Sequence, residues 1–239
     1  AVGALEIGAQ VRAGEAPSGS TPPITARYAI AIAEVDEEGA FTTQATLDRS
    51  SLPATSPLAT GASNLDGVSV RAGVDARGIV RELSYTLPAG AAPDVAAAFE
   101  QVRSVLAQLT VPVPEEPVGI GARWRLDQSV EGPVDAQQET VVELVSREDD
   151  VLILETTLRQ SADLEEVRLP GMPGAAGAQL EAFEGRGSGR VRLRLDGLVP
   201  EELASTLTTT TRLGAPPGAR GPLTLRVELT TRVTRATAE

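Results

Sequence analysis

Apolar and polar residues alternate along most of this chain, which is typical of β-strands that bury one face. The alternation predicts roughly ten antiparallel strands, over residues 24–32, 41–47, 68–74, 79–87, 124–130, 140–145, 151–158, 191–195, 203–213 and 223–229. Short polar turns at 36–39, 75–78 and 147–150 join three pairs of these strands into hairpins. Residues 1–12 predict a further strand at an edge of the sheet.

The segment 93–109 departs from this pattern and predicts one amphipathic helix. Its apolar residues recur every three or four positions: Val95, Phe99, Val102, Leu106 and Leu109. Pro93 suits a first helical turn, and Pro112 ends the helix. A helix with one apolar face buries that face against a sheet. It either completes the core or covers a curved sheet and leaves a cavity beneath.

Three segments rich in Gly, Pro, Ser, Thr or Ala predict irregular loops, over about 14–23, 50–66 and 161–185. Met172 is the apolar centre of the last one. A length of 239 residues fits one large β domain. We therefore predict a single domain over 1–239 that is mainly β: a strongly curved antiparallel sheet or half-open β-barrel with one central amphipathic helix packed on it.

The order of these elements resembles a group of bacterial envelope proteins. Residues 117–124 read Pro-Val-Gly-Ile-Gly-Ala-Arg-Trp, similar to a P-V-G-x-G-x-x-W step in uncharacterised envelope proteins, and the layout is similar to the half-open barrels of LolA/LppX-type lipoprotein carriers. The resemblance implies a concave sheet and a helix that enclose an apolar cavity for acyl chains. Taken alone, the two glycines also fit a bend before a strand, and Trp124 also fits a core position.

Missing residue types exclude most enzymatic chemistry. The chain has no Cys, no His and no Lys, which removes the usual catalytic triads, zinc sites built on Cys or His, and Schiff-base chemistry. Acidic clusters fall mostly in predicted turns and loops. The segment 185–189, Gly-Arg-Gly-Ser-Gly, precedes a predicted strand instead of opening a helix, so it does not fit a phosphate loop. We expect no enzyme, no cofactor and no metal site.

Charge and hydropathy limit the partners. The net charge of −12 argues against general nucleic-acid binding, and no run of about 18 apolar residues predicts a transmembrane segment. Residues 186–239 are nevertheless rich in arginine. Alternation places three arginines on one face of a strand and brings a fourth beside them if the strands are neighbours: Arg190, Arg192, Arg194 and Arg226. They form either ion pairs with the acidic half of the chain or an anion-facing patch for lipid headgroups or an acidic partner.

Three functions remain open. The leading hypothesis is a non-catalytic, extracytoplasmic, lipoprotein-like domain of the periplasm or cell surface, which binds a lipid or other hydrophobic ligand between sheet and helix. Its expected cavity residues are Phe99, Val102, Leu106, Trp124, Tyr85 and Met172. The alternative is a structural or protein-interaction module with an envelope partner, a filled core and no ligand; a carboxylate-dependent hydrolase is the third. The chain begins at Ala1, which suggests a mature form, anchored to lipid through a removed segment.

Overall fold

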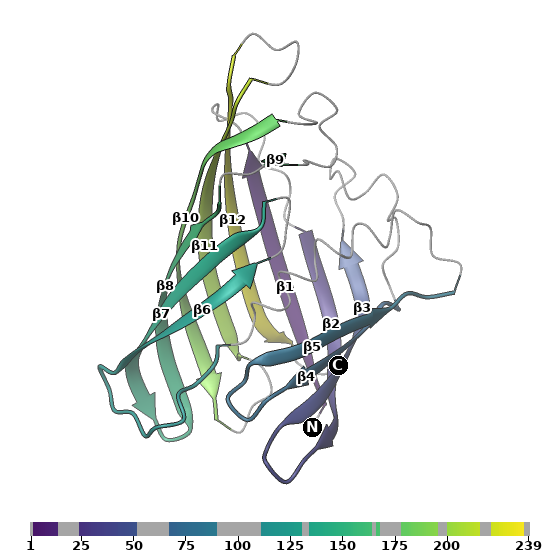
Figure 1. Cartoon of the computed structure of the whole chain (residues 1–239). Helices are drawn as coiled ribbons and strands as arrows, with labels where there is room; N and C mark the ends of the chain where they lie inside the picture. The colour runs from purple at the N-terminus through teal and green to yellow at the C-terminus, as the bar shows by residue number, and fades with distance from the viewer. Residues whose placement is uncertain are drawn as a thin grey trace.

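The computed structural model of this chain is all-β in the residues that it describes, and the paired strands are antiparallel (Figure 1). It describes residues 2–13, 24–51, 67–89, 111–130, 134–163, 166–167, 178–195, 200–215 and 221–236. The strands are β1 (Val2–Ala13), β2 (Ile24–Val35), β3 (Phe41–Ser51), β4 (Ser69–Val74), β5 (Val80–Thr86), β6 (Arg123–Val130), β7 (Ala136–Glu148), β8 (Val151–Ser161), β9 (Glu166–Val167), β10 (Ala178–Arg194), β11 (Glu202–Leu213) and β12 (Leu223–Ala236).

The main sheet follows one continuous path, in the order β5-β4-β3-β2-β1-β12-β11-β10-β8-β7-β6. The short strand β9 pairs with the first residues of β10 in a second, two-stranded sheet. The first and last strands of the chain lie side by side in the middle of the path, with Ile7 opposite Val233. The prediction of an edge strand over 1–12 is therefore wrong, because β1 has β2 on one side and β12 on the other.

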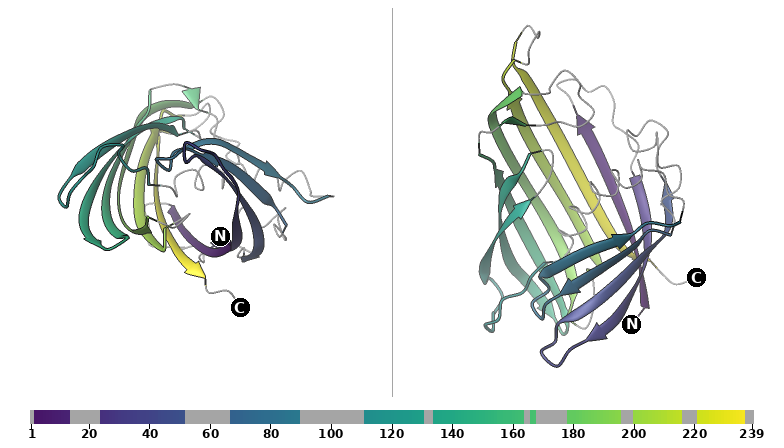
Figure 2. Two further views of the ribbon diagram at one scale, coloured as in Figure 1. Left: turned by 90° about the horizontal axis from the view of Figure 1, so that it is seen from below. Right: turned by 45° about the vertical axis from the view of Figure 1, so that its right-hand side comes forward.

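The sheet is strongly curved, and β4 and β5 turn across in front of its lower part (Figures 1 and 2). It ends at β5 on one side and at β6 on the other, and these two strands do not pair with each other in the described sheet. Closure into a barrel requires that the last strands share hydrogen bonds. Neither of the two sheets is therefore a barrel.

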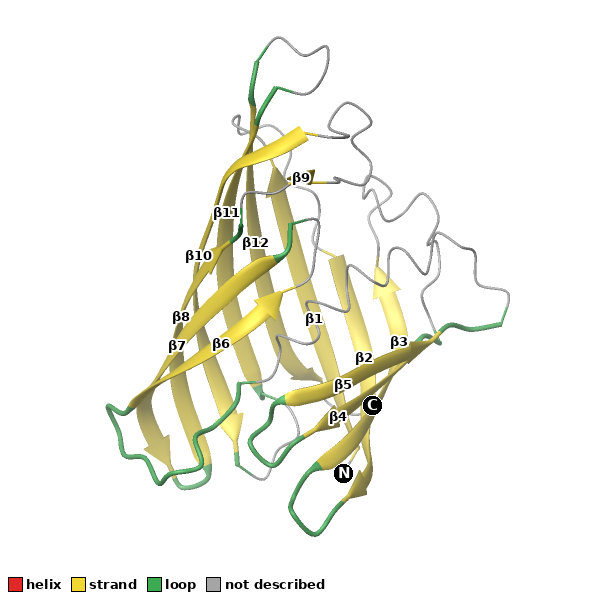
Figure 3. Ribbon diagram, in the orientation of Figure 1, coloured by secondary structure: helices red, strands yellow, loops and turns green. Residues whose placement is uncertain are grey.

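The predicted half-open barrel with a central helix is wrong as a fold class. No helix occurs among the described residues, as the colouring in Figure 3 shows. The segment predicted as that helix, 93–109, lies outside the described residues. The concave side of the sheet buries its apolar residues largely against itself, because the two halves of the curved sheet meet across it. Among the described residues, no amphipathic helix supplies this cover.

The main core joins both halves of the chain. Strands β2 and β3 supply Tyr28 and Leu47, and strands β7, β8 and β12 supply Val142, Leu154 and Val233, all buried in one cluster. A smaller cluster forms around Leu180 and Leu213 near the opposite end of β10 and β11. Strand β7 alternates between buried and more exposed positions over most of its length, as the period of two predicts.

The three predicted hairpins are confirmed as β2–β3, β4–β5 and β7–β8. The side chain of Asp75 holds the β4–β5 turn, because its Oδ1 accepts hydrogen bonds from the backbone N–H groups of Ile79 and Arg77. Burial alone would raise the pKa of Asp75, but the bonds from Ile79, the Arg81 side chain and Arg77 outweigh it and hold that pKa below its usual value.

Parts of two segments predicted as irregular are strands instead. β3 continues to Ser51, β8 continues to Ser161, and β10 begins at Ala178. The glycine-rich segment 185–189 lies inside β10 and does not precede it. Ladder hydrogen bonds with β8 and β11 on both sides hold this segment extended, and this pairing is not visible in its local composition. The predicted loop 14–23 and Met172 lie outside the described residues.

Candidate ligand-binding cavity

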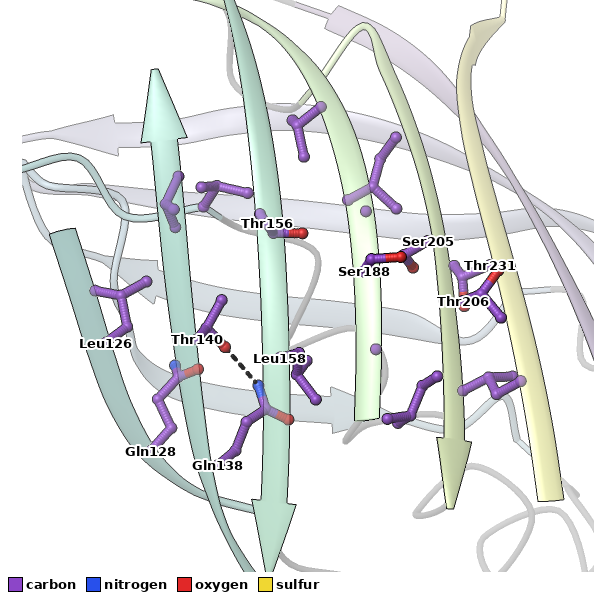
Figure 4. A pocket seen from close by; sticks show the side chains of 18 residues that line it. Leu126, Gln128, Gln138, Thr140, Thr156, Leu158, Ser188, Ser205, Thr206 and Thr231 are labelled. Carbon is purple, nitrogen blue, oxygen red and sulfur yellow. Dashed lines mark hydrogen bonds between the residues drawn. The ribbon is translucent and has the colours of Figure 1, made fainter. Parts of the chain in front are cut away.

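The concave face of the sheet is hollowed over six consecutive strands, β6, β7, β8, β10, β11 and β12 (Figure 4). The hollow has a volume of about 220 Å³, and Val111 from the connector before β6 also borders it. Its lining combines leucine and valine side chains with the hydroxyl or amide groups of Thr, Ser and Gln. The cavity lies beside the main core, since Val142, Val191 and Leu203 belong to both.

Strand register arranges most of the inward-facing residues of the cavity in three rows that cross the strands. The row nearest the main core is Val142–Thr156–Gly189–Ser205–Thr231. The middle row is Leu126–Thr140–Leu158–Gly187–Leu207–Leu229. The third row begins Gln128–Gln138–Gln160–Gly185. A band of leucines therefore lies between a row of small hydroxyl residues and a row of amides.

Glycines on β10 occupy the centre of all three rows. A Cβ atom added at Gly187 would lie 2.8 Å from the backbone oxygen of Thr206, and one added at Gly189 would lie 2.8 Å from Oγ1 of Thr156. Both distances are shorter than normal contacts, so neighbouring strands approach β10 more closely than a side chain there would allow. Because these glycines have no side chains, the concave face has a depression along β10, and side chains of β8 and β11 form the sides of this depression.

Two amides of the third row, Gln138 and Gln160, are buried and hydrogen-bonded to each other. Gln138 is 4% exposed and Gln160 is 7% exposed. Gln160 donates from Nε2 to Oε1 of Gln138 over 2.8 Å. Gln138 in turn donates from Nε2 to Oγ1 of Thr140 over 3.3 Å, the bond drawn in Figure 4. Buried amides require such partners, because an unsatisfied polar group in a protein interior costs about 1–3 kcal/mol. The bonds fix which way each amide points.

None of the described residues that line the cavity is charged. Charged residues make up 23% of the chain, so their exclusion from this face reflects the strand alternation that puts them on the opposite one. An ionised group in the cavity would face no opposite charge from these residues, and burying an unpaired charge is costly. The arrangement suits an uncharged molecule with both apolar and hydrogen-bonding parts.

The predicted cavity residues lie outside this hollow or outside the described chain. Trp124 and Tyr85 are partly buried and pack against the main core. Trp124 pairs in register with Val142, at the end of the row nearest that core, and its indole Nε1 donates to the carbonyl oxygen of Pro112 over 2.9 Å. The remaining four predicted residues are not among the described ones: Phe99, Val102, Leu106 and Met172.

Sequence reasoning missed the residues that do line the cavity, among them Gln138, Thr140, Leu158 and Leu207. One signal was present in the sequence. Glycine at every second position of 185–189 gives an extended strand a bare face. Reading the segment as a strand, and not as a loop before one, would have marked a depression in the sheet. The register that brings the leucines and glutamines beside it depends on long-range pairing.

The predicted arginine patch is largely neutralised. Arg190, Arg192 and Arg194 lie on the face of β10 opposite the cavity and contact carboxylates. Arg190 Nη1 lies 3.5 Å from Glu155 Oε1, Arg192 Nε lies 2.9 Å from Glu201 Oε2, and Arg194 Nε lies 3.8 Å from Glu201 Oε1. Arg226 stands apart, opposite Thr210 in a different part of the β11–β12 ladder. Such exposed pairs contribute about 0–1 kcal/mol each.

Among the described residues, no group of three or more Asp, Glu, His or Cys side chains is placed to hold a metal ion. No helix in this part of the chain is long and apolar enough to cross a membrane. Comparison with known proteins supplies no identity, because neither a protein-family model nor a curated protein matches the chain.

Proposed function

We propose that the protein binds a lipid or similar apolar molecule in the cavity on the concave face of β6–β8 and β10–β12, without catalysis. One observation carries the proposal: the middle row places four leucines, Leu126, Leu158, Leu207 and Leu229, around the bare position of Gly187. Apolar contact area is the main source of affinity in such sites, and a few polar groups set orientation. A non-catalytic role is supported by the absence of charged residues from the described lining.

The resemblance of residues 117–124 to envelope proteins supports a location outside the cytoplasm, where the protein carries or presents its ligand, anchored to lipid or working with an envelope protein partner. This part of the proposal rests on the sequence. Fractionation of the native host would test it, and recovery of the protein in the cytoplasmic fraction would contradict it.

Binding is tested with a lipid probe that quenches tryptophan fluorescence only when it is bound near the tryptophan. Trp124 is the single tryptophan of the chain and stands in register beside Val142 of the cavity wall. A monoacylglycerol with bromine atoms on its acyl chain quenches indole fluorescence at short range. We expect saturable quenching of Trp124 by this probe, and native mass spectrometry should show one added mass that organic extraction removes.

Two adjacent residues of β8 provide a matched pair of variants. Leu158 lines the cavity, and Thr157 points to the opposite, exposed face. Leu158→Glu places a carboxylate in the apolar row and should abolish quenching, whereas Thr157→Glu should bind as the wild type does. If Leu158→Glu fails to fold, Leu158→Gln carries the same test without a charge. Equal quenching in the two folded variants would place the probe elsewhere and overturn the proposal.

An interaction module without a ligand is the second candidate. The observation that favours it is a pair of exposed apolar side chains on the segment that leads into β6, Val118 at 41% and Ile120 at 68% exposure. Apolar groups this accessible can mark a surface that a partner covers. An unchanged apo mass after incubation with the brominated probe, together with no quenching, would favour this candidate over the lipid-binding one.

A further inference from the structure

We infer that the hydroxyl group of Thr140 recognises an uncharged hydrogen-bond acceptor of the ligand, the carbonyl oxygen of an ester or amide, and so selects acyl lipids over plain alkyl chains. This inference rests on the proposed function and names the chemical class of ligand for the same cavity. The residues that carry it are Gln160, Gln138 and Thr140, which form one directed chain of hydrogen bonds along the cavity wall.

The direction of this chain is set by its donors. Gln160 donates its amide N–H to the carbonyl of Gln138, and Gln138 donates its own amide N–H to the oxygen of Thr140. A hydroxyl group has one hydrogen to donate and two lone pairs that accept. Since Thr140 Oγ1 accepts from Gln138, its hydrogen is not used in this chain and is left for another acceptor. Bonds in such a chain polarise one another, which strengthens the terminal donor.

Thr140 is the polar member of the described leucine row. Its register neighbours on either side are Leu126 and Leu158, and all three line the cavity. An acyl chain of the ligand that lies along the leucines therefore passes beside the hydroxyl group of Thr140. The adjacent row begins with Gln128 and Gln138, which also line the cavity, so the polar end of a ligand lies toward the amides and its apolar end toward Leu207 and Leu229.

The described lining also determines the charge of the recognised group. With no charged side chain in it, a carboxylate or phosphate at Thr140 would be buried without a counter-charge, which is unfavourable. An ester or amide carbonyl accepts a hydrogen bond and remains neutral. The uncharged lining and the hydroxyl donor of Thr140 therefore both favour a neutral acyl group next to Thr140.

The test compares two neutral lipids that differ at one position. 1-Monomyristoylglycerol has an ester carbonyl, and 1-O-tetradecylglycerol has the same head group and chain length with an ether in its place. Affinities are measured for each by displacement of the brominated probe from Trp124. We expect the wild type to favour the ester by about 3- to 10-fold, the range for one hydrogen bond.

Three variants separate recognition from folding. Thr140→Val keeps the shape and removes the hydroxyl, so it should bind both lipids with the affinity that the wild type shows for the ether. Thr140→Ser keeps the hydroxyl and should keep the preference. Thr157→Val makes the Thr-to-Val change on the opposite face of the neighbouring strand and should leave the preference unchanged.

Each outcome decides something different. A wild type that binds both lipids equally, or a folded Thr140→Val that still prefers the ester, overturns the inference and leaves the proposed function intact. A wild type that binds neither lipid overturns the proposed function, and the inference with it. Loss of the preference in Thr140→Val and its retention in Thr140→Ser would establish Thr140 as the specificity residue.

Discussion

Trp124 on the edge strand β6 donates a hydrogen bond from its indole Nε1 to the carbonyl oxygen of Pro112, over 2.9 Å. Next to it, Val113 donates its backbone N–H to the carbonyl oxygen of Arg77 in the β4–β5 turn, and Arg77 donates from Nε back to the oxygen of Val113. The connector around residues 112–113 therefore ties the hairpin at one end of the open sheet to the strand at the other.

Removal of the indole donor of Trp124 should weaken the connection between the 112–113 connector and β6. Trp124→Phe keeps an aromatic ring against the main core but removes the bond to Pro112, so we expect a loss of about 1–2 kcal/mol in the free energy of unfolding. Circular dichroism in urea measures it without tryptophan fluorescence. Arg123→Gln, on the exposed face of the same strand, is the control; it removes only an exposed ion pair with Glu143 and should change stability by less than about 1 kcal/mol. Equal stability of the two variants would contradict this account.

Gly187 should not tolerate even a methyl group. A Cβ there would lie 2.8 Å from the backbone oxygen of Thr206, and a backbone atom cannot move away as a flexible side chain can. We expect Gly187→Ala to destabilise the fold by about 1–3 kcal/mol. Gly119→Ala is the matched control, since nothing lies within 4 Å of its Cβ position. Thermal unfolding of both variants checks the prediction, which fails if their melting temperatures coincide.

The shared core predicts one cooperative unfolding transition. Leu154 is fully buried in the cluster that joins β2 and β3 to β7, β8 and β12. Leu154→Ala should cost about 2–5 kcal/mol and shift a single transition, whereas Leu195→Ala, at an exposed position, should cost less than about 0.5 kcal/mol. Two separate transitions in calorimetry would show that the single-domain prediction is wrong.

Tyr28 should make the protein sensitive to alkali. Burial raises the pKa of its phenol to about 12, above the value of 10.0 that an exposed tyrosine has. Between these two values the unfolded chain releases the proton and the folded chain keeps it, so stability falls as pH rises, by up to about 1.4 kcal/mol per pH unit. Tyr28→Phe should flatten this decline. Denaturant titrations at pH 9 to 12 measure it, and identical slopes for both proteins would refute the assignment.

Asp75 should make the opposite contribution in acid. Its pKa is lower in the folded chain than in the unfolded one, so the stabilisation is present at neutral pH and is lost as pH falls below about 3.9 and through the folded value. Asp75→Asn should cost about 1 kcal/mol at pH 7, a modest figure because the Arg81 partner is exposed. The difference from wild type should shrink as pH falls and vanish in acid that protonates the folded carboxyl. A difference that persists there would assign the effect to the turn geometry instead of the charge.

Local patterns in the sequence determined the strands and their inward faces. Alternation over 68–74, 140–145 and 151–158 gave the correct element type and the correct turns, because a half-buried strand needs only its own residues to show a period of two. The same property placed Arg190, Arg192 and Arg194 on one face. The periodicity of 93–109 led to the wrong fold class, since an amphipathic pattern alone does not show what covers a sheet.

Only the tertiary structure decided which strands are neighbours. The pairing of β1 with β12 joins residues from the two ends of the chain, and it turned an expected edge strand into a central one. The cavity depends on the same kind of information: the register across β6, β7, β8, β10 and β11 sets Thr140 between leucines and Gly187 in their midst. The physical reason is that register between distant segments is fixed by the fit of whole faces against each other. No single segment contains that fit.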